Sequence, residues 1–204
     1  MILKIKIILA STSRYRAELL SRLQIPFDVA KPAVDETPIA DEAPQATALR
    51  LAIAKAKIVA DAVADASPHD ASNILVIGSD QVADLNGQQL GKPGTRERAR
   101  AQLQAMRGQT LVFHTAVALV NAKTRRVQSR IVPTEVVFRD YRDAEIENYL
   151  DRENALDCAG SAKSEGLGAA LILRMTSDDP TALVGLPLLA LTNMLAQENF
   201  WVLA

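Results

Sequence analysis

The sequence predicts an α/β fold, with a mixed twisted sheet flanked by helices and two lobes around a central cleft. Strand-like apolar runs alternate along the chain with helical stretches, which favours layers of helices on a sheet. The length of 204 residues, 49% of them hydrophobic, fits one domain with a substantial core. We find no repeat, low-complexity tract or long linker, so we assign residues 1–204 to a single domain.

The first third of the chain predicts a strand, a helix, a short return and a second helix. Ile5–Ala10 is an apolar run that Lys6 interrupts, which is typical of a strand. A helix is expected from about Arg14 to Leu23, followed by a return segment over Gln24–Val29. Pro44 opens a long helix that reaches about Ala66, because proline is tolerated in a first helical turn.

The middle of the chain begins after a polar break at Ser67–Asn73. Ile74–Ile77 is a short apolar run ending at Gly78, which indicates a buried central strand. Asn86-Gly87 supplies the turn of a hairpin, and a helix is expected over Thr95–Arg107.

The remaining segments predict a long hairpin and then mixed elements. The hairpin strands are Leu111–Val120 and Val127–Phe138. After them we expect a helix over Asp143–Leu150, a Gly/Ser/Ala loop over Ala159–Gly168, a strand near Ala170–Leu173 and a helix after Pro187. The helix-rich first half and the hairpin-rich middle are expected to form the two lobes.

Charge and composition exclude several classes of partner. The 23 Lys and Arg residues balance 24 Asp and Glu residues, which argues against a surface that binds a nucleic acid polymer. Aromatic residues are only 4%, so a stacking platform for single strands is not expected either. Lys4 and Lys6 place charges within the apolar N-terminal run, which argues against a signal-peptide core. Polar residues, glycine and proline interrupt the stretch Pro180–Gln197, which argues against a membrane span. We therefore expect no membrane association.

The single cysteine, Cys158, cannot form an internal disulfide and is expected to be a small buried hydrophobic residue. His69 and His114 lie far apart in the sequence, so a zinc site has no support. The lack of a disulfide framework fits a cytoplasmic protein.

The segment LASTSRYRAELL, residues 9–20, places a polar loop between a strand and a helix. The free N–H groups of a helix N-terminus favour phosphate, and here Ser11, Ser13 and Arg16 add hydroxyls and a fixed positive charge. The alternative is that Ser13 only caps the helix and the arginines are solvated.

The segment ILVIGSDQV, residues 74–82, places Asp80 directly after a buried strand, where open α/β sheets bind ligands. Asp80 could bind a divalent metal or accept a proton from water, or it could only stabilise a turn. Lys55 lies on a partly apolar stripe of the long helix, where its ammonium needs an anionic partner or must extend to solvent.

Glu36 in VDETP and Lys92 in GKP are weaker candidates. GQQLGK is not a P-loop, because the glycine spacing is short and Pro93 stands where Ser or Thr is required. Hydroxyls, cations and carboxylates of this kind suit a polyphosphate with a divalent metal. The chemistry they favour is attack of water on phosphorus, without a covalent nucleophile or redox cofactor.

In this order, the motifs resemble the Maf family of nucleoside triphosphate pyrophosphatases along nearly the whole chain. Seven blocks match in register: LASTSRYRAELL, VDETP, RLAIAKA, IGSDQV, LGKP, DCAGSAKSEGLG and LVGLPL. The resemblance is closest to the branch acting on 7-methyl-GTP. Gly-Ser-Asp-Gln stands at 78–81 and Ser-Glu-Gly at 164–166, where the dTTP/UTP branch has Gly-Ala-Asp-Thr and Ile-Gln-Gly.

The resemblance implies a Maf/ITPase-like fold and hydrolysis of a nucleoside triphosphate between its α- and β-phosphates, with Mg²⁺, Mn²⁺ or Co²⁺ as cofactor. It makes Asp80 the proton acceptor and a metal ligand. It places base selectivity at Tyr15, Gln81 and Glu165, and it places phosphate and metal handling at Ser11, Arg16, Glu36, Lys55 and Lys92. It also suggests a homodimer. Arg14 departs from the family, which usually has proline there.

Two alternatives remain open beside 7-methyl-GTP hydrolysis. One is the same reaction on dTTP or UTP, and the other is a nucleotide-binding regulator of cell division. The positive charge of the 7-methylguanine ring favours 7-methyl-GTP over these alternatives, because the Glu165 carboxylate and the Tyr15 aromatic face would both attract it.

Overall fold

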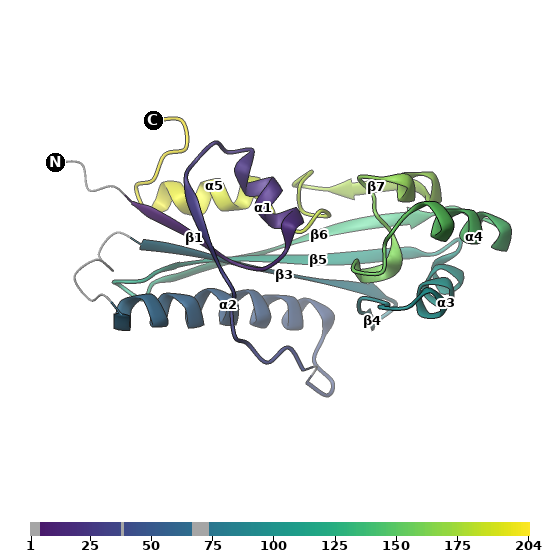
Figure 1. Ribbon diagram of the computed structural model, residues 1–204, viewed down its shortest axis with the longest axis horizontal. Helices are drawn as coiled ribbons and strands as arrows, with labels where there is room; N and C mark the ends of the chain where they lie inside the picture. The colour runs from purple at the N-terminus through teal and green to yellow at the C-terminus, as the bar shows by residue number, and fades with distance from the viewer. Residues whose placement is uncertain (1–4, 38, 67–73) are drawn as a thin grey trace.

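In the computed structural model, which describes residues 5–37, 39–66 and 74–204, the strands form one seven-stranded mixed sheet. The strand order is β2-β1-β3-β5-β6-β7, and β4 pairs with β3 beyond the end of β1. The pairs β1–β2 and β1–β3 are parallel, whereas the remaining pairs are antiparallel. Figure 1 shows the long central strands running the length of the molecule with helices on both faces. The predicted fold class is confirmed.

The N-terminal elements lie close to their predicted positions. β1 spans Lys6–Ala10, α1 spans Arg14–Ser21, β2 spans Phe27–Ala30 and α2 spans Pro44–Ala66. Helix α1 ends at Ser21, two residues before the predicted end. The predicted return segment leads into β2, which pairs parallel with β1 at the edge of the sheet.

The predicted end of a strand at Gly78 is wrong. β3 runs without a break over Ile74–Leu85, because β5 (Thr110–Asn121) pairs with it antiparallel from Leu75 to Asp84. Gly78 instead allows close packing: a Cβ atom there would lie 2.2 Å from the carbonyl oxygen of Ala52 in α2. The glycine therefore marks the contact of the strand with a helix.

The rest of the chain follows the predicted order with shifted bounds. A turn at Asn86-Gly87 leads into β4, and the β5–β6 hairpin forms as expected. The predicted strand near Ala170–Leu173 starts later, because residues up to Leu171 form a 3₁₀ turn. The remaining elements are β4 Gln88–Leu90, α3 Arg96–Met106, β6 Val127–Phe138, α4 Asp143–Arg152, the 3₁₀ turns Ala159–Ser161 and Leu167–Leu171, β7 Ile172–Ser177 and α5 Leu188–Gln197.

Three apolar clusters define the lobes. One cluster lies between the sheet and helices α1 and α5, and a second packs α2 onto the opposite face. The third joins α3, α4 and the far ends of β5 and β6. The lobes therefore do not follow the predicted division into first half and middle. The β5–β6 hairpin runs through both lobes, and α5 returns to the N-terminal one (Figure 1).

Among the described residues, no helix is long and apolar enough to cross a membrane. The residues 1–4, the polar break at Ser67–Asn73 and His69 within it lie outside the described ranges.

Candidate active site

The candidate site lies at a gap in the edge of the sheet. β1 pairs with β3 only as far as Gly78, and β4 pairs with β3 only from Ala83 onward. In the described part of the chain, no strand pairs with Ser79–Val82 on that side. Because side chains alternate along β3, Asp80 lies on the face of α2, whereas Ser79 and Gln81 lie on the face of α1 and α5.

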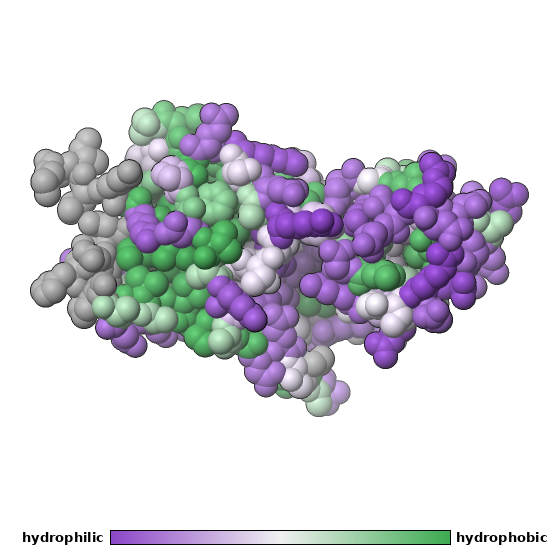
Figure 2. Space-filling view, viewed as in Figure 1, coloured by the Kyte–Doolittle hydropathy of each residue, from purple (hydrophilic) through white to green (hydrophobic). Residues whose placement is uncertain are grey.

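A cavity of about 1330 Å³ opens at this gap. Figure 2 shows the hollow between the two halves of the molecule, with hydrophilic residues along its rim. The volume exceeds the roughly 300–1,000 Å³ of common small-molecule pockets, so a nucleotide with its metal has room. All of the sequence-predicted site residues line it: Ser11, Ser13, Tyr15, Arg16, Glu36, Lys55, Asp80, Gln81, Lys92 and Glu165.

Two carboxylates meet at one buried ammonium. Lys55 Nζ lies 2.7 Å from Asp80 Oδ1 and 2.8 Å from Glu36 Oε1. Lys55 is 5% exposed, so its ammonium has the anionic partners that its place in α2 requires. The half-exposed Glu36 comes from the loop before α2 and Asp80 from the middle of β3.

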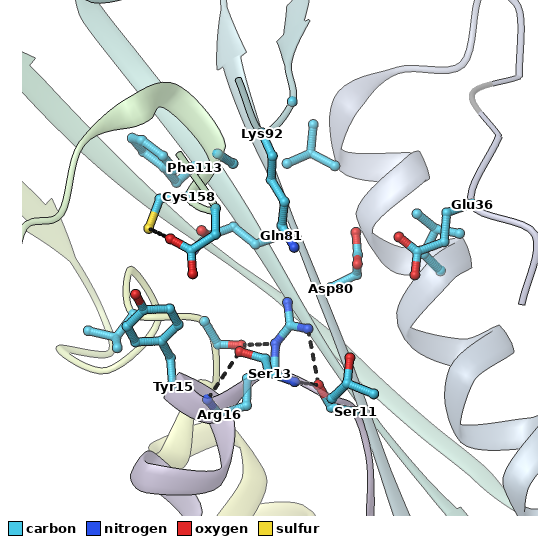
Figure 3. Close-up of a pocket in the computed structure, with 18 of the residues that line it drawn as sticks. Ser11, Ser13, Tyr15, Arg16, Glu36, Asp80, Gln81, Lys92, Phe113 and Cys158 are labelled. Atoms are coloured by element: carbon cyan, nitrogen blue, oxygen red, sulfur yellow. Dashed lines mark hydrogen bonds between the residues drawn. The ribbon is translucent and has the colours of Figure 1, made fainter. Parts of the chain in front are cut away.

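The guanidinium of Arg16 reaches the cavity from α1 on the other side of the gap. Its Nε donates to the carbonyl oxygen of Gly185 at 2.9 Å, and Nη1 donates to Ser11 Oγ at 3.5 Å. Burial lowers the pKa of Arg16, and the charges of Asp80 and Glu36 partly oppose this effect. Figure 3 shows Lys92 and Arg16 pointing into the cavity from opposite sides.

Ser13 has the structural role that the sequence left open as an alternative. Its Oγ caps α1 by accepting from the backbone N–H of Arg16 at 3.5 Å. Ser11 Oγ accepts from the Ser13 N–H at 3.1 Å, so the two hydroxyls order the start of the helix. Both residues also line the cavity.

The end of the cavity away from Asp80 carries Tyr15, one of the residues predicted to select the base. Figure 3 places Tyr15 and Cys158 on one side and Asp80 and Glu36 on the other. Arg14 lies over the Tyr15 ring, 4.8 Å from its centroid, and donates to the Tyr15 hydroxyl at 2.8 Å. Glu165 is exposed at the rim. The cavity therefore offers an aromatic ring, with the Arg14 guanidinium over it, and a carboxylate at its rim.

The Gln81 side chain holds a loop next to the cavity. Its Nε2 donates to Thr115 Oγ1 at 2.8 Å and to the carbonyl oxygens of Ala182 and Leu183 at 3.2 and 2.9 Å. Any effect of Gln81 on the ligand is therefore coupled to the position of this loop.

Cys158 differs from its prediction as a buried hydrophobic residue. It is only partly buried, lines the cavity and donates to Asp157 Oδ1 at 3.5 Å. Burial, with a smaller contribution from Asp157, raises the pKa of its thiol to about 11. It is therefore not an activated nucleophile.

The donor set fits a divalent metal that also binds substrate phosphates. No group of three or more His, Cys, Asp or Glu residues suited to a metal occurs in the described ranges. Mg²⁺ needs no such group, because one or two carboxylates plus phosphate oxygens and water usually hold it. Glu36 and Asp80, which share the Lys55 ammonium, are the two carboxylates in position.

Comparison with known proteins identifies the family of this chain. The family model described as "Maf-like protein" matches residues 6–198. The chain belongs to the Maf family. A protein named 7-methyl-GTP pyrophosphatase from Thiobacillus denitrificans is 58% identical to this Maf chain, over 97% of the chain and 94% of the relative.

Two further relatives carry the same name. The protein from Aromatoleum aromaticum is 58% identical over 95% of this chain and 96% of its own. The protein from Burkholderia thailandensis is 59% identical over 96% of this chain and 88% of its own.

Sequence reasoning missed what the LVGLPL block of this Maf chain does. Its Gly185 carbonyl accepts from Arg16 and from Ser79 Oγ. The buried Asp179 orders this loop by accepting from the N–H of Thr181 and, at the start of α5, from that of Leu189. The Asp-Pro pair ahead of a helical run indicates an ordered turn. Nothing in the sequence indicates that this loop contacts Arg16 in α1.

Proposed function

We propose that this protein hydrolyses 7-methyl-GTP to 7-methyl-GMP and pyrophosphate and so removes the modified nucleotide from the pool. The observation that carries the proposal is the cavity itself, where a Lys55–Asp80–Glu36 cluster lies at one end and Tyr15 at the other. The name shared by relatives 58% identical over nearly the whole chain supports the same substrate.

Asp80 is the proton acceptor in the proposed reaction. Lys55 holds its Oδ1 at 2.7 Å, which leaves Oδ2 to take a proton from the attacking water. The water oxygen bonds to phosphorus, the anhydride bond between the α- and β-phosphates breaks, and pyrophosphate leaves.

The cations around the gap bind the triphosphate. Arg16 is held by Gly185 and Ser11, and Lys92 enters from the opposite side, so their charges converge where phosphates would lie. Glu36 and Asp80 would hold a divalent metal, which when bound neutralises phosphate charge.

The opposite end of the cavity selects the base. A 7-methylguanine ring is positively charged, so the Tyr15 face and the Glu165 carboxylate attract it more than they attract neutral guanine or uracil. Gln81 contributes through the loop at Ala182 and Leu183, whose carbonyl oxygens it holds.

A nucleotide panel with pyrophosphate detection tests the proposal. We expect the highest kcat/KM for 7-methyl-GTP among 7-methyl-GTP, GTP, ATP, dTTP and UTP, measured with Mg²⁺, Mn²⁺ and Co²⁺ in turn. A preference for dTTP or UTP would show that the substrate is a pyrimidine nucleotide and not 7-methyl-GTP. Tight binding without product under every metal would instead indicate a nucleotide-binding regulator.

A further inference from the structure

A second buried ion pair lies next to the base end of the cavity. Lys163 Nζ is 3.0 Å from Glu153 Oε1, and only 11% and 20% of the two side chains are exposed. Glu153 is the C-cap residue directly after α4. Removing two charges from water is costly, so a buried ion pair often adds little to the free energy of unfolding. A role other than stability is therefore worth seeking for this pair.

The pair fixes the turn that carries Glu165. Glu153 uses its second oxygen, Oε2, to accept from the N–H of Leu167 at 3.1 Å. The N–H of Lys163 donates to the Tyr149 hydroxyl at 3.1 Å, and the carbonyl oxygen of Lys163 accepts from Gly166 at 3.2 Å. Residues 163 and 167 are thus held on both sides of Glu165.

Close packing leaves the turn little freedom. A Cβ atom on Gly168 would lie 2.4 Å from the Lys163 carbonyl oxygen, and one on Gly166 would lie 2.6 Å from Glu153 Oε2. The glycines of Ser-Glu-Gly-Leu-Gly therefore let the turn wrap around Lys163 and Glu153. Glu165 is the exposed acidic residue of this turn, and it lines the cavity.

The pKa of Lys163 reflects two neighbours, Glu153 and Tyr15. Burial alone would lower the pKa of Lys163, but the hydrogen bond with Glu153 and the nearby Tyr15 hydroxyl raise it. The Lys163 ammonium is therefore bound to Glu153, the residue whose second oxygen holds the turn of Glu165.

We propose that Lys163 and Glu153 are a positioning pair that sets base selectivity by fixing the Glu165 turn against Tyr15. The inference rests on the proposed function, because the role of the pair follows only if the base of the substrate is positively charged. Glu153 also neutralises the Lys163 ammonium, which alone would repel 7-methylguanine. The incoming base then meets the negative charge of Glu165 and the face of Tyr15.

Steady-state kinetics of Lys163→Met and Glu153→Gln on 7-methyl-GTP and GTP test this pair. We expect each change to raise KM for 7-methyl-GTP about tenfold, the effect of losing one charged hydrogen bond, and to leave kcat nearly unchanged. KM for GTP should rise much less, so the ratio of kcat/KM for the two nucleotides falls. Lys163→Arg, which keeps the charge, should restore most of the ratio.

Glu135→Gln is the matched control, because Glu135 forms an exposed ion pair with Arg174 on β6 and β7 at 2.9 Å, outside the cavity. It should change neither KM nor the nucleotide ratio. Equal losses for both nucleotides in Lys163→Met and Glu153→Gln, with a lowered Tm, would show a purely structural pair and overturn the inference.

A double-mutant cycle separates this inference from the proposed function. If Lys163 acts through Glu165, adding Lys163→Met to Glu165→Gln should raise KM no further, whereas additive effects would overturn the inference. If the wild-type protein prefers dTTP or UTP, the proposed function fails. The same cycle on that preferred nucleotide then decides whether the pair positions the turn.

Discussion

At the scale of single residues, the site depends on charges that compensate one another. Asp80 and Glu36 share Lys55, and Arg16 is held by a carbonyl and a hydroxyl oxygen. The sequence indicated that Lys55 needed an anionic partner, and the structure identifies two. The structure also places Asp80 in the middle of a strand, which excludes the alternative that Asp80 only stabilises a turn.

Asp80→Asn should strongly reduce turnover and leave the protein folded. We expect kcat to fall by about 10³-fold, within the range that a positioned general base contributes. Lys55 keeps Glu36 at 2.8 Å, so the ammonium is not left without a partner. Pyrophosphate release and thermal unfolding measure the two effects.

The matched control is Asp84→Asn, four residues along the same strand. Asp84 pairs with His114 at 3.2 Å and does not line the cavity. This variant should keep wild-type kcat, and normal hydrolysis by Asp80→Asn would show that another group accepts the proton.

Cys158 should react slowly with iodoacetamide at neutral pH. Its pKa of about 11 lies above the ordinary 9.0 because burial disfavours the thiolate. The alkylation rate should therefore rise about tenfold per pH unit through pH 9 and level off only near pH 11. Mass spectrometry of the peptide that contains Cys158 follows the reaction, and the chain has one cysteine.

The urea-unfolded chain is the reference for that experiment. Its thiol should titrate near the ordinary value and react faster at pH 7. A plateau of the folded protein near pH 9 would contradict the shift.

At the scale of elements, the contact between β3 and α2 sets the geometry of the catalytic pair. Gly78 packs against Ala52 and Ala56 of the helix, which lie on either side of Lys55 in the sequence. Asp80 lies two residues further along the same face of β3. A small shift of α2 away from the strand would therefore move the ammonium away from the carboxylate.

Gly78→Ala should destabilise the protein and reduce its activity together. The added methyl would lie 2.2 Å from a backbone oxygen, so α2 must shift. We expect a loss of about 2 kcal/mol in the free energy of unfolding, typical of overpacking, and a lower kcat. Urea denaturation and pyrophosphate release measure these effects.

Gly91→Ala is the stability control, because a Cβ there meets nothing within 4 Å. Its free energy of unfolding should stay close to wild type. Equal stability of Gly78→Ala would show that α2 does not depend on the close approach.

At the scale of the whole molecule, the site exists because one sheet edge is shared by two separate strands. β1 covers the start of β3 and β4 covers its end, so the cavity opens at residues 79–82 between them. A chain with a net charge of −1 thereby brings Arg16, Lys55 and Lys92 to one cavity. The balanced charge excludes a broad anion-binding surface but not a local one.

Metal removal should stop catalysis without unfolding the molecule. Glu36 and Asp80 are already held by Lys55, so the fold does not depend on a metal between them. After EDTA treatment, we expect pyrophosphate release to vanish, the Tm to stay unchanged and added Mg²⁺ to restore activity. Full activity of the EDTA-treated protein would remove the metal from the proposed reaction.

Much of the fold could be predicted because its signals are local. Helix α2 has its predicted bounds, since a proline start and an apolar stripe mark it within the sequence itself. The strand end at Gly78 was predicted wrongly, because a glycine in an apolar run looks the same whether a strand stops or a helix packs against it.

The sequence by itself determined the alternating elements, the order of the motif blocks and the residue types suited to a nucleotide. Only the tertiary structure decided the gap in the sheet edge, the partners of Lys55 and the loop that holds Arg16. Arg16 and Gly185 are 169 residues apart, and Lys55 and Asp80 are 25 apart. Contacts at such separations depend on which elements pack together, and local propensity carries no information about that packing.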